Sequence, residues 1–165
     1  METALNAFLA AQRFAARIAG AFTWLPPLLA RLTVGWIFFQ SGWGKLHNLG
    51  QVTDYFASLG LPAPAAQATF ASANEFVCGA LLLAGLATRY AAVPLIVIML
   101  VALRTALWDQ IDSLGSLFGI AEYLYIALLV GIATYGPGPV SIDGLLERRA
   151  TQPKPSPGML SMRVV

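Results

Sequence analysis

The stretch from Asn74 to Tyr90, NEFVCGALLLAGLATRY, places one carboxylate, Glu75, inside an apolar segment that is long enough to cross a bilayer. A charge at membrane depth costs at least about 2.5 to 3.5 kcal/mol, so such residues face a partner or a wet cavity inside a helix bundle. The fold must therefore turn Glu75 toward such a partner or cavity. Glu75 is also the first candidate for a functional residue.

The composition indicates the class of protein. Of the 165 residues, 58% are hydrophobic and only 11% are charged, and the mean hydropathy is +0.69. These values exceed those of a typical soluble domain and predict an all-α integral membrane protein. The net charge of +2 is small, and the basic residues gather near segment ends instead of forming a stripe. No nucleic-acid partner is therefore expected.

The chain has a single cysteine, Cys78. One cysteine excludes an internal disulfide, a CxxC redox pair and a multi-cysteine metal site within one chain. The sequence also offers no recognisable ligand set for haem or an iron–sulfur cluster. We expect no metal site and no covalently bound cofactor.

Hydropathy and turn signals divide the chain into three parts. Residues 1–22 predict an amphipathic helix on the membrane surface, with Arg13 and Arg17 on its polar side. A cleaved signal peptide is the alternative, although no small-residue cleavage site follows a short apolar core. Residues 23–145 predict a four-helix transmembrane bundle, and residues 146–165 predict a polar, disordered cytoplasmic tail. The expected spans cover about residues 28–46, 65–87, 91–108 and 116–135, with a short interfacial helix between the first two that ends at Gly60.

Basic residues predict the orientation of these spans. Most lie on the side shared by the N-terminus, the second connection and the tail: Arg13, Arg17, Arg89, Arg148, Arg149, Lys154 and Arg163. The positive-inside rule then predicts a multi-pass protein of the cell (inner) membrane with both termini in the cytoplasm. Arg31, near the entry of the first span, is expected to extend its guanidinium to the interface.

Counting residues from the outer end of each span places four polar residues at similar depths in the membrane. At 1.5 Å per residue, they lie about 10 to 15 Å below the outer ends of their spans: Gln40, Glu75, Arg104 and Glu122. If their faces turn inward, two carboxylates and one guanidinium come within reach, with Lys45 at the mouth. Either Lys45 completes the charge balance, or one glutamate holds a proton.

These residues permit two interpretations. Aromatic side chains on the same faces would surround the polar cluster as in a small-ligand pocket: Trp36, Trp43, Trp108, Phe118 and Tyr125. Alternatively, the polar residues simply hold helices together, and the tryptophans near helix ends form interfacial belts. Gly115 and Gly119 form a GxxxG spacing, which predicts close helix packing in the fourth span.

Four stretches of the sequence resemble those of a known protein family in their order and spacing: GWIFFQSGWGKL, YFASLGLPAP, EFVCGALLLAGLATRYAA and EYLYIALLVGIATYGPGPVSIDGLL. Together, over about residues 31–145, they resemble the DoxX family of small four-helix membrane proteins. Lys45, Glu75 and Arg89 occupy motif positions of that family. One departure is Cys78, where the family often has glycine, and it adds a thiol near Glu75.

The resemblance implies a link to membrane redox systems, with a redox partner protein and the lipid bilayer as partners and a homo-oligomer as a further expectation. The leading hypothesis is an accessory subunit that binds a quinone or similar amphipathic ligand in the outer half of the bundle. Lys45, Gln40 and Arg104 would donate hydrogen bonds to carbonyl oxygens, and Glu75 or Glu122 would carry the proton. The predicted ligand-binding residues are Trp36, Gln40, Lys45, Glu75, Arg104, Trp108, Glu122 and Tyr125. A small-solute permease or exporter and a scaffold for soluble partners are the alternatives.

Overall fold

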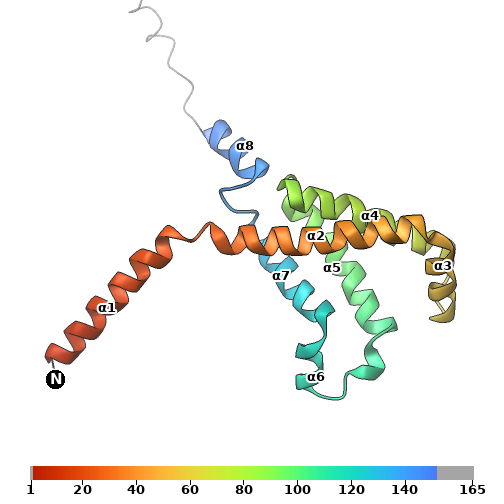
Figure 1. The fold of residues 1–165 in the computed structure, drawn as a ribbon, viewed down its shortest axis with the longest axis horizontal. Coiled ribbons are helices and arrows are strands. Elements are labelled where there is room, and N and C mark those ends of the chain that lie inside the picture. Colours follow the sequence, from red (N-terminus) through yellow and green to blue (C-terminus); the bar gives the residue numbers. More distant parts are fainter. Residues whose placement is uncertain (1, 152–165) are drawn as a thin grey trace, which may run out of the picture.

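The computed structural model describes residues 2–151, without the side chains of residues 2–4 and 7. Every regular element in this part of the chain is helical, which confirms the all-α prediction (Figure 1). In chain order the elements are α1 (Glu2–Ala21), α2 (Leu25–His47), α3 (Leu49–Ser58), α4 (Pro64–Ala84), α5 (Thr88–Thr105), the 3₁₀ turn η1 (Trp108–Gln110), α6 (Leu114–Gly119), α7 (Ala121–Tyr135) and α8 (Ile142–Thr151).

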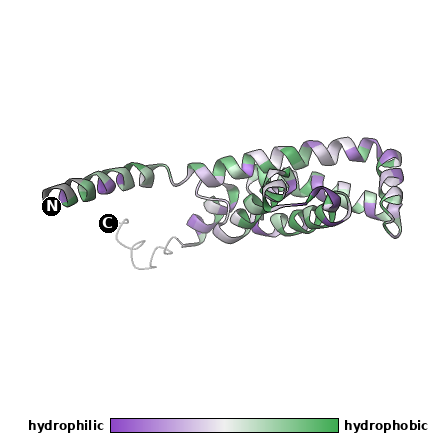
Figure 2. Cartoon of the chain, turned by 90° about the horizontal axis from the view of Figure 1, so that it is seen from below, coloured by the Kyte–Doolittle hydropathy of each residue, from purple (hydrophilic) through white to green (hydrophobic). Residues whose placement is uncertain are grey.

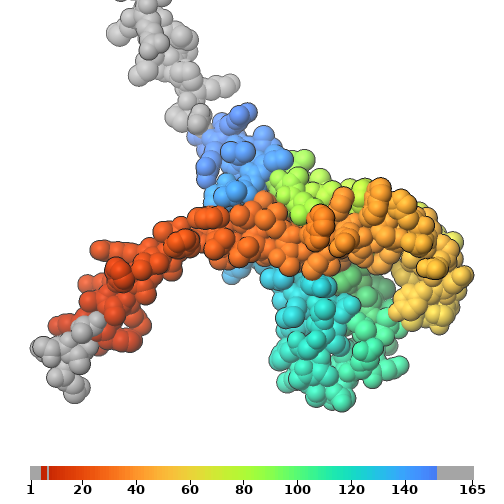
Figure 3. All heavy atoms as spheres, in the orientation of Figure 1, coloured from red at the N-terminus to blue at the C-terminus, as the bar shows by residue number. Residues whose placement is uncertain are grey.

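The long helices pack as two pairs. α2 lies along α4, and α5 lies along α7. Figure 1 shows the α5/α7 pair leaving the α2/α4 pair at a steep inclination, and α1 projecting away from both. α3 folds back against α4 at the far end of α2. The space-filling view shows the same arm-like α1 and the two helix pairs in contact (Figure 3).

The core lies where the two pairs cross. Its largest fully buried apolar side chains come from all four long helices: Val34, Leu82, Leu95, Leu129 and Ile132. Cys78 belongs to the same cluster and is 6% exposed. Lipid tails are as apolar as these side chains, so the cluster holds the pairs together through van der Waals packing.

Glycines allow α2 and α4 to approach closely. A Cβ atom added at Gly42 would collide with the backbone of Phe76, and one added at Gly79 would collide with the backbone of Phe39. The predicted GxxxG contact at Gly115 and Gly119 is wrong, because Gly119 has no atom within 4 Å of such a Cβ and Gly115 meets only Ser113 of its own turn. The close contact through small residues therefore joins α2 and α4.

Several predicted boundaries need correction. The fourth apolar stretch is interrupted at Ile120, which has extended backbone (ψ 128°), so α6 and α7 are separate helices. Pro94 lies inside α5 and not in its first turn. Residues 146–151, predicted as disordered tail, belong to α8, and residues 152–165 lie outside the described part. Gly60 ends the short helix with a positive φ of 71°, as predicted.

By length and composition, one helix of the described part, α5, can cross a membrane by itself. The segment Phe8–Ala21 and α2 meet the same criterion together, with a bend of 46° between them, and α7 is a shorter apolar helix. Much of the apolar surface of α5 and α7 is exposed, including Val93, Val97, Leu100, Leu124 and Val130. Figure 2 shows predominantly hydrophobic colouring over the middle helices and mixed colouring along α1.

Arg31 does not extend to the interface as predicted, because its side chain is only 4% exposed. Its Nη2 donates to the carbonyl oxygen of Val140 at 2.9 Å, and its Nη1 lies against Gly85, where α4 ends. The negative end of the α4 dipole and the nearby Asp143 compensate the guanidinium. Arg31 therefore fastens the segment before α8 to the α4/α5 turn.

Asp143 completes this connection from α8. Its carboxylate accepts hydrogen bonds from the backbone N–H groups of Ala87 and Thr88 at 2.8 and 2.9 Å, and from the Thr88 hydroxyl at 2.9 Å. Partial burial acts to raise the pKa of Asp143, but these hydrogen bonds and the Arg31 charge outweigh it and hold the pKa below its ordinary value. Asp143 thus acts as a cap for α5, supplied by a distant part of the chain.

We expect Asp143→Asn to lower the free energy of unfolding by about 1 kcal/mol, allowing for the partial solvent exposure of the carboxylate. Because the folded-state pKa is lowered, this contribution is fully present above the ordinary pKa of about 3.9. It is lost only as the pH falls through the lower folded-state value. Thermal unfolding in detergent should show a constant deficit for the variant at neutral and mildly acidic pH. A deficit that disappears already near pH 6 would contradict this assignment.

Candidate functional site

An ion pair joins α2 to α4. Lys45 Nζ lies 2.6 Å from Glu75 Oε1 and 2.8 Å from Oε2, and the Ser41 hydroxyl donates to Oε2 at 2.8 Å. The Glu75 side chain is 1% exposed, whereas the Lys45 side chain is 36% exposed. Both carboxylate oxygens are therefore satisfied by α2, while the ammonium group keeps contact with the surroundings.

The local sequence of α2 explains this geometry. Ser41 and Lys45 are four residues apart, so their side chains lie on one face of the helix. Gly42 lies between them against the backbone of Glu75 and Phe76. The absence of a side chain at Gly42 lets the two helices approach until the short Ser41 side chain reaches the carboxylate. The glycine contact and the ion pair thus form one structural unit.

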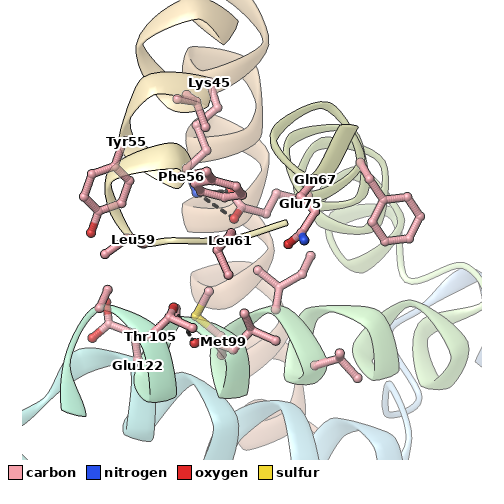
Figure 4. Close-up of a pocket in the computed structure, with 18 of the residues that line it drawn as sticks. Lys45, Tyr55, Phe56, Leu59, Leu61, Gln67, Glu75, Met99, Thr105 and Glu122 are labelled. Carbon is pink, nitrogen blue, oxygen red and sulfur yellow. Dashed lines mark hydrogen bonds and ion pairs between the residues drawn. The ribbon is translucent and has the colours of Figure 1, made fainter. Parts of the chain in front are cut away.

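The ion pair borders a cavity of about 810 Å³ between α3, α4 and α5 (Figure 4). Three residues of the charged types line it, Lys45, Glu75 and Glu122. Apolar side chains form most of the remaining wall, among them Val52, Phe56, Leu59, Leu61, Phe70, Ala71, Val97, Met99, Val101, Ala102 and Leu107. A largely apolar cavity with a few polar groups is the usual form of a small-ligand site.

Glu122 lies on the α5/α7 side of this cavity, whereas Lys45 and Glu75 lie on the α2/α4 side (Figure 4). The break at Ile120 starts a new helix at Ala121, which puts Glu122 in the first turn of α7. The positive end of the helix dipole favours a carboxylate at this position. Within the described part of the chain, no hydrogen bond or ion pair occupies the Glu122 side chain.

The structure separates the other predicted site residues from the cavity. Arg104 is exposed and its guanidinium carbon lies 5.0 Å from the centre of the Trp108 ring. The expectation that Arg104 comes within reach of Glu75 is therefore wrong, whereas Lys45, expected at the mouth, pairs with Glu75. Trp36, Gln40 and Trp108 are exposed and do not line the cavity. Tyr125 packs edge-on against Phe38, with ring centres 6.0 Å apart, beside the core.

Sequence reasoning missed the contribution of α3. Val52, Tyr55, Phe56 and Leu59 recur at helical spacing, which predicted a short helix at the interface. In the structure these four side chains form one wall of the cavity. Their spacing could have indicated a second buried surface, because an amphipathic helix of ten residues needs something to cover its apolar face. Ser41 was also missed as a partner of Glu75.

A buried carboxylate paired beside an apolar cavity, with apolar helix surfaces facing outward, is typical of an all-helical membrane protein, and the cavity has the size of a small ligand. The DoxX family model matches residues 27–108, from α2 to the start of η1. The chain belongs to the DoxX family.

Two relatives extend this similarity beyond the matched region. One is "Uncharacterized membrane protein Rv3486" of Mycobacterium tuberculosis, 34% identical over 139 residues that cover 76% of this chain and 85% of the relative. Another is "Putative oxidoreductase CatD" of Bacillus subtilis, 32% identical over 105 residues that cover 64% of this chain and 73% of the relative. No solved structure matches the chain.

Proposed function

We propose that this protein binds a quinone or a similar amphipathic ligand in the cavity and serves a redox-linked membrane system. The observation that carries the proposal is the position of the Lys45–Glu75 pair in the wall of an otherwise apolar cavity of about 810 Å³. Such a cavity accepts a ring with a polar head and part of an apolar tail. The name of the Bacillus relative, a putative oxidoreductase, supports the redox link.

Lys45 is the residue suited to bind a carbonyl oxygen. An ammonium group has three N–H donors, and two of them are directed at the oxygens of Glu75. One donor remains, on a side chain that is partly exposed. Glu75 fixes the position of the ammonium group, so the third N–H donates a charge-assisted hydrogen bond to the ligand.

Glu122 complements Lys45 from the other side of the cavity. A carboxylate accepts hydrogen bonds, so it suits the hydroxyl group of a hydroquinone and can take up its proton. Reduction of a quinone consumes two electrons and two protons. In this proposal a redox partner protein exchanges the electrons, Glu122 exchanges one proton with the ligand oxygen on its side, and water at the Lys45 side of the cavity exchanges the second proton with the other oxygen. Lys45 holds the other oxygen.

The membrane arrangement in this proposal has four crossings by α2, α4, α5 and the α6/α7 segment. α2 and α4 have 23 and 21 residues, which correspond to about 35 and 32 Å of helix and exceed the hydrocarbon thickness of a bilayer. Both termini lie in the cytoplasm, as the basic residues predict, and the cavity then lies in the outer half. A ligand dissolved in the bilayer can approach it between helices.

The test compares parent protein with Glu122→Gln, which keeps the shape of the side chain but removes its charge. We expect the variant to bind a short-chain quinone as the parent does, and to bind the corresponding hydroquinone about tenfold more weakly, because a hydrogen bond to a charged acceptor is lost. Titration calorimetry of the protein in detergent measures both affinities. Mass spectrometry of the mildly extracted parent should also detect co-purified quinone.

Two tryptophan variants provide the controls. Ala102→Trp fills the cavity and should abolish binding of both ligands, whereas Ala127→Trp places the same ring on the exposed side of α7 and should leave both affinities unchanged. Equal binding by Ala102→Trp and parent would contradict the cavity as the binding site. Solute transport by proteoliposomes with no quinone affinity would instead support a permease.

A further inference from the structure

Aromatic residues mark one end of the long helices. Tyr90, in the first turn of α5, is 83% exposed, and Tyr135, the last residue of α7, is 88% exposed. Trp24 directly precedes α2 at the same end of the molecule and is 37% exposed. Tryptophan and tyrosine are enriched where a membrane meets water. These three residues place a membrane boundary at this end.

The structure fixes α8 at the level of this boundary. Besides the Arg31 and Asp143 contacts, the backbone N–H of Asp143 donates to the Gly85 carbonyl oxygen at 2.9 Å. Ser141 is 7% exposed, and its hydroxyl accepts from the N–H of Gly144 at 3.0 Å. The start of α8 is thus joined to the α4/α5 turn, so the helix is not a loosely attached tail.

α8 carries an exposed apolar side that nothing in the described part of the chain covers. Ile142, Leu145 and Leu146 are 41%, 56% and 53% exposed, and their spacing puts them on one face. Arg148 and Arg149 follow in the last turn and are also exposed. The Asp143 carboxylate accepts hydrogen bonds from the backbone at the start of α5. Glu147 is therefore the one acid in Ile142–Thr151 left to offset the charge of the two arginines.

Other basic groups lie at the same end. Arg13 and Arg17 are exposed on α1, together with the apolar Phe14 and Ile18. Arg89 is exposed at the start of α5. Figure 1 shows α1 and α8 extending from the same end of the α2/α4 pair. Exposed apolar faces with adjacent arginines at a membrane boundary match the chemistry of a lipid surface whose headgroups carry negative charge.

We infer that α8 is a membrane-surface helix that, together with α1, binds anionic phospholipid headgroups. Ile142, Leu145 and Leu146 enter the acyl boundary, and Arg148 and Arg149 contact the phosphates. This inference is independent of the ligand in the cavity. It assigns a lipid-binding role to a segment whose sequence alone suggests a polar tail.

The first test measures the depth of α8 in the full-length protein. A nitrobenzoxadiazole label is attached at Leu145→Cys in lipid nanodiscs of phosphatidylcholine and phosphatidylglycerol, with and without brominated acyl chains. Cys78 is buried, so the unsubstituted protein is the mock-labelled control. We expect strong quenching at Leu145→Cys and weak quenching at Glu147→Cys, an exposed position about 160° away around the helix. A water-exposed label at Leu145→Cys would overturn the inference, and so would crosslinking of two copies through this position.

The second test measures lipid preference. Native mass spectrometry from mixed micelles should show that Arg148→Gln combined with Arg149→Gln weakens phosphatidylglycerol binding about thirtyfold, since each arginine near an anionic surface contributes about fivefold. Arg104→Gln, an exposed arginine at the other end of α5, is the matched control and should change little. Equal losses in the control and the double variant would show that α8 has no particular role.

Discussion

Lys45→Gln should lower the free energy of unfolding by about 3 kcal/mol or more, because it leaves the buried Glu75 carboxylate without its counter-ion. Glu75 is 1% exposed, and its other hydrogen-bond partner, Ser41, is uncharged. Glu75→Gln should cost less, about 1 kcal/mol, because Lys45 is 36% exposed and its ammonium group can turn toward water. The asymmetry follows from the unequal burial of the two partners.

Thermal unfolding in detergent measures this difference. For a chain of this size, 3 kcal/mol corresponds to a fall in melting temperature of about 6 to 12 °C. The double variant Lys45→Gln with Glu75→Gln should recover most of the loss, since no buried charge then remains unpaired. Arg104→Gln is the control, because this residue is exposed and does not contact Glu75. A greater loss in Glu75→Gln than in Lys45→Gln would mean that Glu75 is not a buried anion.

The same variants separate stability from binding. If the Lys45–Glu75 pair serves only to stabilise the fold, ligand affinity should change only when the fold is destabilised. The double variant, which recovers stability, would then bind the ligand as the parent does. The proposed function predicts instead that the double variant folds and binds the quinone weakly, because the charged donor at position 45 is missing. Binding by the double variant with parental affinity would leave Lys45 and Glu75 as a structural pair.

Sequence patterns predicted the helices well where apolar runs end at strong turn signals. Gly60 and the prolines after it end α3, and Gly136 ends α7 with a positive φ of 84°. The interruption at Ile120 was not predictable from such signals, because an apolar residue in extended conformation has no sequence signature of its own. That interruption matters for the proposed function, since it places Glu122 in the first turn of a new helix beside the cavity.

The partner of Glu75 could not be predicted from depth alone. Counting residues along a helix gives the height of a side chain, but not the direction in which the helix turns it or which helix lies next to it. Arg104 was expected at a height similar to that of Glu75, and Lys45 at the mouth above it. Only Lys45 lies on the helix that Gly42 and Gly79 bring against α4. The correct partner therefore depended on which pair of small residues forms the close contact, and the more obvious GxxxG spacing lies elsewhere, at Gly115 and Gly119.

Because α2 and α4 are in close contact, adding a side chain between them should also destabilise the protein strongly. At Gly42 an added Cβ would meet backbone atoms of Glu75 and Phe76, and at Gly79 it would meet backbone atoms of Phe39. A flexible side chain could move aside, but backbone within a helix cannot do so without separating the two helices. Overpacking costs typically 1 to 3 kcal/mol and sometimes more. Gly42 and Gly79 therefore belong to the most sensitive positions of the fold.

We expect Gly42→Ala and Gly79→Ala each to lower the free energy of unfolding by about 3 kcal/mol, measured as a large fall in melting temperature in detergent. Gly44→Ala is the matched control on α2, because nothing lies within 4 Å of its added Cβ. It should be neutral or stabilising by up to about 1 kcal/mol through helix propensity. Gly42→Ala should also weaken quinone binding in the folded fraction, since a wider gap between α2 and α4 separates Lys45 and Ser41 from Glu75. If Gly42→Ala and Gly79→Ala prove as stable as Gly44→Ala, α2 and α4 are not in close contact at these glycines. The geometry of the Lys45–Glu75 ion pair, which depends on that contact, would then be incorrect.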